Sequence, residues 1–195
     1  MRRATIALMS ALALCAGCSS TRRPVDTYSL LVPSDAGWAA RDNQGTAIIA
    51  VPESAALGIF AEPFIVERRG VRLVRELYRT WSPRPGMMLA VALTDAINAT
   101  GSNVAQVGSP DDARWVVQTL IRDWSYQATP SGLVARIEVD LAVSDERQHA
   151  TMLHTSFVAA KCADASSYDA LIAAFDSSLK QVCAQCVAQI ASAAK

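Results

Sequence analysis

An apolar side chain at every second position over residues 133–143 constrains the fold more than any other feature of the sequence. The positions between the apolar ones include Arg136, Glu138 and Asp140. The apolar positions are Leu133, Ala135, Ile137, Val139, Leu141 and Val143. Because successive side chains of a strand point to opposite faces, the segment predicts a strand with one buried and one solvated face.

The neighbouring segments predict the strands that pair with it. Residues 115–126 are rich in β-branched and aromatic side chains, which favour strands. The polar residues 145–149 predict a turn, and residues 152–160 predict a strand that pairs back. The order of these segments therefore predicts an antiparallel hairpin.

Shorter strands are predicted in the first half of the chain. Residues 28–32 form a first candidate strand, and residues 46–51 contain a continuous apolar run typical of a strand buried on both faces. Residues 64–67 and 71–77 flank an Arg-Arg-Gly sequence that ends at Gly70. Because glycine adopts positive φ readily, this spacing predicts a second hairpin.

Two helices complete the predicted fold. Pro85 suits a first helical turn, Gly101 suits a helix end, and apolar residues between them share one face. Ser166 with Asp169 resembles a capping box before a longer helix. The apolar face of that helix is Leu171, Phe175, Leu179, Val182, Cys186, Ile190 and Ala193. We therefore expect an α+β domain, a mixed and largely antiparallel sheet with two main helices packed on one face.

The first 25 residues predict export and anchoring. Arg2 and Arg3 precede an uncharged apolar stretch, and small residues precede Cys18, as in a secretory signal. Ala16-Gly17-Cys18 resembles a bacterial lipobox, although a cysteine stands where leucine is usual. We expect residues 1–17 to be a signal peptide, 18–25 a tether acylated at Cys18, and 26–195 a single domain. The serine after Cys18 resembles the Gram-negative sorting signal that sends lipoproteins to the outer membrane, so we expect the protein there.

Composition and motifs argue against several functions. Hydrophobic residues make up 51% of the chain and charged residues 18%, which fits a globular protein. Without residues 1–17 the formal charge is −2, which does not favour a nucleic-acid partner. Neither a nucleophile elbow nor a zinc-binding His-Glu-x-x-His motif is present. We therefore predict no catalytic residues, no metal site and no cofactor.

Three cysteines allow two interpretations, as core residues or as partners in a disulfide. Cys183 and Cys186 form a C-x-x-C pattern inside the predicted final helix, and Cys162 ends the strand before it. Because the pair lies away from a helix N-terminus, the helix dipole does not activate either thiol. Cys183 and Cys186 could be core residues, or Cys162 could bridge to either in an oxidising compartment.

Trp81 and Arg79 are the candidate contacts with a partner. Trp81 lies beside two prolines at the corner between a strand and the first helix, where a surface position is credible. Arginines cluster before it, at positions 68, 69, 72, 75 and 79. These arginines form either a solvated hairpin face or a surface for a polar or anionic partner.

The order of motifs resembles the ABC-type transport auxiliary lipoprotein family, which includes the PqiC-like lipoproteins. Thr27-Tyr28-Ser29-Leu30 resembles the opening strand of that family. Residues 60–68 resemble its proline-led β-run, and residues 78–85 resemble its Arg-Trp motif before prolines, here with Thr80 inserted. The resemblance implies a non-catalytic lipoprotein that accompanies an ABC permease and an MCE-type periplasmic protein. Such proteins accompany the movement of lipids or other hydrophobic molecules between membranes, sometimes as homo-oligomeric rings.

The primary hypothesis is therefore a lipid-anchored accessory subunit of an envelope transport system, on the periplasmic face of the outer membrane. A lipid-binding or assembly lipoprotein without an ABC partner is the first alternative. An envelope hydrolase that uses a serine is the second, because His149 and His154 could pair with one of many serines.

Overall fold

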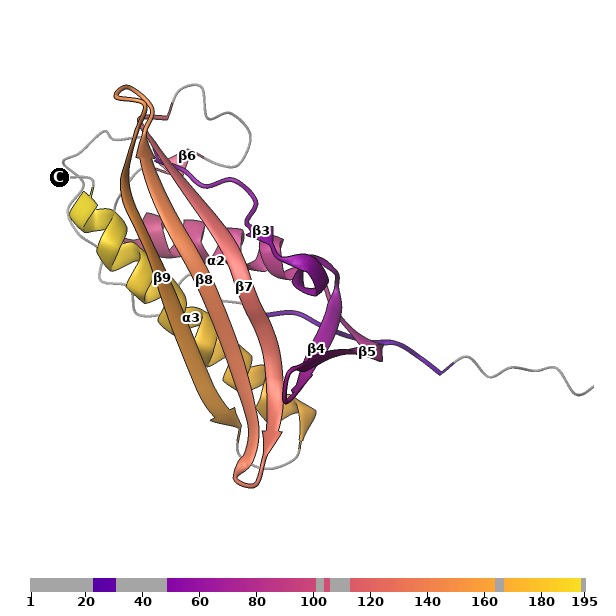
Figure 1. The fold of residues 1–195 in the computed structure, drawn as a ribbon. Coiled ribbons are helices and arrows are strands. Elements are labelled where there is room, and N and C mark those ends of the chain that lie inside the picture. The colour runs from indigo at the N-terminus through magenta and orange to yellow at the C-terminus, as the bar shows by residue number, and fades with distance from the viewer. Residues whose placement is uncertain (1–22, 31–48, 101–103, 106–112, 164–166, 194–195) are drawn as a thin grey trace, which may run out of the picture.

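The computed structural model describes residues 23–30, 49–100, 104–105, 113–163 and 167–193. Figure 1 shows one sheet with helices behind it. The strands are β1 (Asp26–Tyr28), β2 (Ile49–Ala50), β3 (Ala55–Ala56), β4 (Phe64–Arg69), β5 (Arg72–Trp81), β6 (Val104–Ala105), β7 (Trp115–Thr129), β8 (Gly132–Asp145) and β9 (Ala150–Ala163). The helices are the 3-10 turn η1 (Gly58–Ala61), α2 (Pro85–Ala99) and α3 (Tyr168–Ala193). Residues 1–22 contain Cys18, so its predicted acylation lies outside the described residues.

Three long antiparallel strands form the frame of the sheet. β8 pairs with β7 on one side and with β9 on the other. The side chains of Ile137, Val139 and Leu141 are all 0% exposed, as the alternation predicts. The turn between β8 and β9 includes His149 at a φ of 50°, and Asp145 accepts hydrogen bonds from the backbone N–H groups of Arg147 and Gln148. The predicted hairpin is therefore confirmed.

Both helices cover the same side of this sheet. In Figure 1, α3 runs behind β8 and β9, and α2 lies beside it behind the sheet. The buried residues of the two helices join those of β7 and β8 in one hydrophobic core. The expected α+β fold, with a mixed sheet and two main helices, is confirmed.

Parallel pairing attaches the first half of the chain to the frame. β4 pairs with β7 through Val66 opposite Ser125, and the short strands β2 and β3 also run parallel to β7. β4 and β5 form the predicted antiparallel hairpin, with Gly70 at a φ of 60°. The first described strand lies at residues 26–28, where it pairs with residues 79–81 of β5, and residues 31–32 of the predicted strand lie outside the described residues.

The start of α2 is packed closely against the preceding segment. Pro85 opens the helix, as predicted, and Gly86 follows it. A Cβ atom on Gly86 would lie 2.4 Å from the backbone oxygen of Ser54, so only glycine fits there. At α3 the described capping contact is a hydrogen bond from the Ala170 N–H to the Ser167 hydroxyl, and Ser166 lies outside the described residues.

Candidate interaction surfaces

Trp81 is a core residue rather than a surface contact. Its side chain is 2% exposed, and its ring lies 5.1 Å from Phe175 and 6.3 Å from Trp124, edge-on to both. The prediction of a surface position is therefore wrong. β7 and α3 supply the aromatic partners, and these are distant in sequence from the proline-rich corner that suggested exposure.

Arg79 is half-buried in a polar and aromatic cluster beside Trp81. Its guanidinium lies 3.8 Å from the ring centre of Tyr168 and forms an ion pair of 3.2 Å with Glu76. Glu76 also accepts hydrogen bonds from the hydroxyls of Tyr126, at 2.5 Å, and Tyr168, at 2.8 Å. The cluster joins β5 to β7 and α3, and a partner contact of Arg79 stays a prediction.

The same cluster holds the segment that leads back toward Cys18. Tyr28 in β1 stacks on Tyr168, with ring centres 6.2 Å apart. The guanidinium of Arg23 lies 5.7 Å from the ring centre of Tyr78 in β5. Because β1 also pairs with β5 in the sheet, the first described residues are fixed to the domain through backbone and side-chain contacts.

The Glu76 cluster predicts a specific acid sensitivity. Burial alone raises the pKa of this carboxyl, but hydrogen bonds from Tyr126 and Tyr168 and the charge of Arg79 outweigh it, so the pKa lies below its ordinary value of 4.5. A lowered folded-state pKa stabilises the protein above the unfolded-state pKa, and this stabilisation is lost as the pH falls through the folded value. Glu76→Gln should therefore lose less stability than the wild type on acidification from about pH 5 to about pH 3.

Urea unfolding at each pH measures this difference. Glu146→Gln is the matched control, because Glu146 is exposed in the turn between β8 and β9. That variant should follow the acid profile of the wild type. Identical profiles for Glu76→Gln and the wild type would show that Glu76 does not carry the effect.

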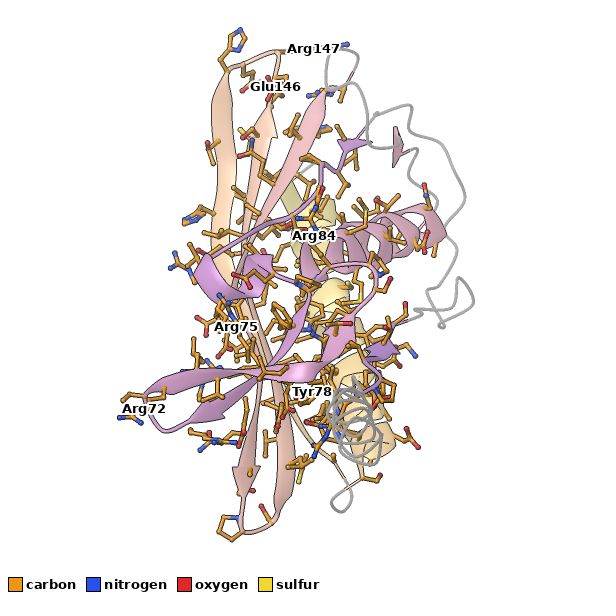
Figure 2. The ribbon with its side chains drawn as sticks, turned by 90° about the vertical axis from the view of Figure 1, so that its right-hand side faces the viewer. Arg72, Arg75, Tyr78, Arg84, Glu146 and Arg147 are labelled. Atoms are coloured by element: carbon orange, nitrogen blue, oxygen red, sulfur yellow. The ribbon has the colours of Figure 1, made fainter. Side chains whose placement is uncertain are left out.

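The β4–β5 hairpin is the most exposed apolar feature of the described residues. Val71 at its tip is 99% exposed, and Leu77 and Tyr78 along β5 are 69% and 46% exposed. Figure 2 shows the hairpin standing out from the sheet on the side away from α3, with Arg72 near its end. The arginine cluster that the sequence indicates therefore lies on a projecting element.

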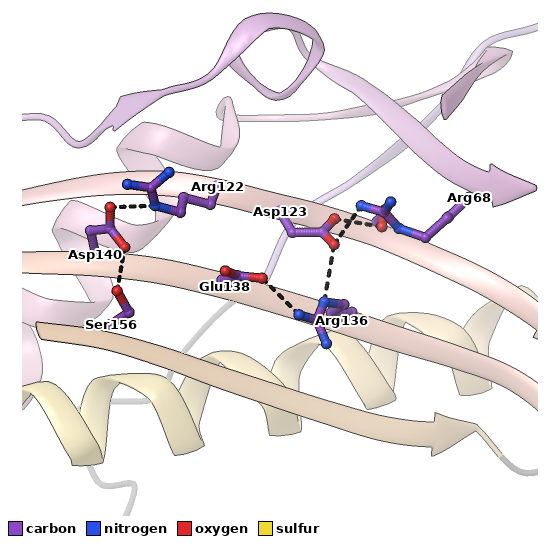
Figure 3. A network of polar contacts seen from close by, with 8 residues as sticks. Arg68, Arg122, Asp123, Arg136, Glu138, Asp140 and Ser156 are labelled. Carbon is purple, nitrogen blue, oxygen red and sulfur yellow. Dashed lines mark hydrogen bonds and ion pairs between the residues drawn. The ribbon is translucent and has the colours of Figure 1, made fainter. Parts of the chain in front are cut away.

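Two buried carboxylates organise the polar face of the sheet. Asp123 has a side-chain exposure of 4% and binds Arg68, at 2.7 Å, and Arg136, at 3.1 Å. Figure 3 shows this group beside a second one, in which Asp140 accepts hydrogen bonds from Arg122 and Ser156. Arg68 belongs to β4, one pair before the last pair of the hairpin, so the first carboxylate ties β4, close to the hairpin turn, to β7 and β8.

A cavity of about 410 Å³ opens near the second carboxylate. Its lining includes Asp140, Glu53 and His154, together with apolar residues of β3, β7 and β8. Asp140 is already satisfied by Arg122 and Ser156. The volume of the cavity lies at the low end of the range for small-molecule sites.

All three described cysteines are free thiols, so neither bridge that the sequence suggested is formed. Cys162 is exposed and lies opposite Val134, whereas Cys183 and Cys186 are buried. Burial raises the pKa of Cys183 well above its ordinary value of 9.0 and that of Cys186 to about 12. The interpretation of Cys183 and Cys186 as core residues fits this burial.

Thiol labelling tests this arrangement. We expect a maleimide to modify Cys162 in the folded protein within minutes, and Cys183 and Cys186 only after denaturation, because buried neutral thiols react poorly. Peptide mass mapping before and after denaturation locates the label. Recovery of a disulfide-linked peptide containing Cys162 from protein prepared without reductant would contradict the structure.

The described residues contain no cluster of three or more metal-binding side chains. None of the helices in the described ranges is long and apolar enough to cross a membrane. His149 and His154 lie apart, in a turn and on β9.

Sequence reasoning missed Glu76, Tyr126, Tyr168 and Asp123, because their contacts join segments that are far apart in the chain.

Comparison with known proteins assigns this fold. A model of the ABC-type transport auxiliary lipoprotein component family matches residues 28–187. The crystal structure of XCC0632 from Xanthomonas campestris, described as a DUF330 protein, is 18% identical, with a TM-score of 0.76 over 87% of this chain and 97% of that chain. The hypothetical protein CT253 from Chlamydia trachomatis is 10% identical, with a TM-score of 0.54 over 75% of this chain and 96% of that chain. These two likenesses show the fold alone, and no curated protein matches the chain.

Proposed function

The chain belongs to the ABC-type transport auxiliary lipoprotein family, and from that membership we propose that it is a non-catalytic, lipid-anchored accessory subunit of an envelope transport system. The family match carries this proposal, because residues 28–187 include strands β2 to β9, α2 and most of α3. The coarse role, an auxiliary lipoprotein component associated with an ABC transporter, follows from the family. The anchor, the membrane and the partner described below are parts of the proposal.

The anchor acts through Cys18. Acyl chains on this residue hold the protein on a membrane, since each buried methylene contributes about 0.8 kcal/mol. Four residues separate Cys18 from Arg23, where the described chain begins its contact with β5. The strand β1 and the Tyr28–Tyr168 contact support a mechanical role, because they connect this tether to the core.

The proposed place is the periplasmic face of the outer membrane, and the proposed partners are an MCE-type periplasmic protein and an ABC permease. Ser19 after the acylated cysteine supports the outer membrane. The protein acts there by binding and positioning a conduit for lipids or other hydrophobic molecules, alone or as a homo-oligomer. The carboxylates of Asp123 and Asp140 are paired within the chain, which supports a structural role for them rather than a catalytic one.

Copurification from native membranes tests this proposal. The full-length protein with a C-terminal tag is cross-linked in cells, extracted in detergent and analysed by mass spectrometry. We expect transporter components to copurify, and we expect Cys18→Ala to lose most of that recovery because it leaves the membrane. Recovery of the acylated protein without any transporter component would contradict the proposal and favour the stand-alone lipoprotein.

A further inference from the structure

The hairpin from Phe64 to Trp81 exposes large apolar side chains. Val71 at the tip is 99% exposed, more than any other large hydrophobic residue described. Leu77 and Tyr78 are also exposed farther along β5, and the Tyr78 ring lies 5.7 Å from the Arg23 guanidinium. Exposed apolar side chains grouped on one projecting element are typical of an interaction surface.

The charge of this hairpin is basic. Residues 62–79 hold five arginines and three glutamates. Arg69 pairs with Glu67 at 2.5 Å, and Arg75 pairs with Glu62 at 2.6 Å. Arg72 follows Val71 directly and has no ion pair among the described residues. The tip therefore presents one apolar side chain with an unpaired positive charge next to it.

Strand β4 is attached to the frame nearly as far as the turn of the hairpin, so the direction of the hairpin is defined. The pair between Arg68 and Asp123 joins β4 to the frame at 2.7 Å, and Val66 pairs with Ser125 of β7. Figure 2 shows that the hairpin points away from the helix side of the sheet. An element that projects in this way reaches a surface that the rest of the domain does not touch.

The tether lies within reach of the same surface. Arg23 contacts Tyr78, and the five residues back to Cys18 span at most about 17 Å when extended. From Tyr78 to Val71, seven steps along the chain span at most about 23 Å when extended. The two lengths are comparable, so one membrane can hold the acyl chains of Cys18 and touch the hairpin.

We propose that the β4–β5 hairpin docks on the lipid surface that holds Cys18, with Val71 at the level of the acyl chains and Arg72 at the anionic headgroups. This inference rests on the proposed lipid anchor. Apolar side chains flanked by arginines suit the interface between headgroups and acyl chains, and basic residues gain from anionic lipids there. With two attachment points instead of one, the domain keeps a fixed orientation on the membrane.

Lipid-borne quenchers test this docking with the full-length acylated protein. Val71→Cys in a Cys162→Ser background carries an environment-sensitive dye, because Cys183 and Cys186 are buried. The protein is reconstituted in vesicles of phosphatidylethanolamine and phosphatidylglycerol, some with brominated acyl chains. Gln148→Cys, in the exposed turn between β8 and β9, is the matched control position.

We expect quenching of the dye at position 71 and none at position 148. Arg72→Glu should lower the ratio of docked to undocked hairpin about fivefold or more, because one basic residue near an anionic surface contributes about 1 kcal/mol. Arg147→Glu, which reverses an exposed charge on the turn between β8 and β9, should leave quenching unchanged. Vesicles of phosphatidylcholine should weaken docking as Arg72→Glu does.

The outcomes separate the two proposals. Vesicle-bound, acylated protein with an unquenched dye at position 71 overturns the docking proposal and leaves the anchor intact. Protein that carries no acyl chains and does not bind vesicles overturns both. A dye at position 71 that stays in water on vesicles but is shielded by a periplasmic partner protein overturns membrane docking in favour of a protein contact.

Discussion

Trp81→Ala is expected to destabilise the domain by about 3 to 5 kcal/mol, as removal of a buried aromatic ring does elsewhere. The ring of Trp81 packs edge-on against Phe175 at 5.1 Å, and Phe175 in turn stacks on Trp124 at 6.4 Å. These three residues belong to β5, α3 and β7, so alanine leaves a cavity where three elements meet. Since a domain is stable by only about 5 to 15 kcal/mol, the variant should be close to unfolding. Urea denaturation measures the loss.

Two further variants test whether the loss of stability comes from the buried ring of Trp81 itself. Trp81→Phe should lose about 1 kcal/mol, because the indole Nε1 has no hydrogen-bond partner among the described residues. Tyr78→Ala removes a half-exposed ring three residues away and should change stability by about 0.5 kcal/mol or less. A Trp81→Ala protein with wild-type stability and impaired partner binding would contradict the core placement.

Asp123→Ala has the second largest expected effect, a loss of about 2 to 3 kcal/mol. The carboxylate accepts hydrogen bonds from Arg68, Arg136 and Ser125, and its side chain is 4% exposed. Removal leaves the guanidinium of Arg68 without its ion-pair partner, while Arg136 keeps Glu138 at 2.7 Å. The loss stays below that of a fully buried pair, because Arg68 and Arg136 are 31% and 40% exposed and regain water.

The part of the domain that loses stability in Asp123→Ala distinguishes a local role of the Asp123 ion pairs from a general destabilisation of the domain. Hydrogen exchange should show faster opening of β4 and β5 in Asp123→Ala than in the wild type, because Arg68 attaches the hairpin to the sheet. Glu146→Ala, at an exposed turn position, should change neither stability nor exchange. Uniform loosening of the whole domain in Asp123→Ala would contradict a local role for the pair.

Local patterns in the sequence predict the elements that depend on neighbours in the chain. Alternation over residues 133–143 predicts β8, and Gly70 marks the β4–β5 turn that the structure contains. The apolar face from Leu171 to Ile190 predicts α3. Each of these signals is local, since it needs only a period of two or of 3.6 residues or one permissive turn residue.

The remaining features depend on pairing between distant segments. A register shift between Ile121 and Asp123 in β7 lets both Ile121 and Trp124 enter the core, although they lie three residues apart. Alternation alone would place them on opposite faces. The parallel pairing of β4 with β7 likewise has no local signal, so the sequence could not show that Arg68 meets Asp123.

The exposed position of Cys162 was open to prediction from the sequence. Phe157, Ala159 and Ala163 share one face of β9, and Cys162 has the opposite parity. Because α3 packs on the first face, a cysteine of the other parity cannot readily reach Cys183 or Cys186. The proximity of Cys162 to α3 in sequence suggested a bridge that this parity does not favour.

Intact-mass analysis of the membrane-extracted protein, beside a Cys18→Ala variant and with membrane fractionation, tests the central claim most directly. The account predicts a protein cleaved before Cys18, carrying acyl chains and found with the outer membrane, whereas the variant is unacylated and leaves the membrane. An unacylated wild-type protein in the soluble fraction would contradict the anchor, and a free periplasmic binding protein would then be the better explanation.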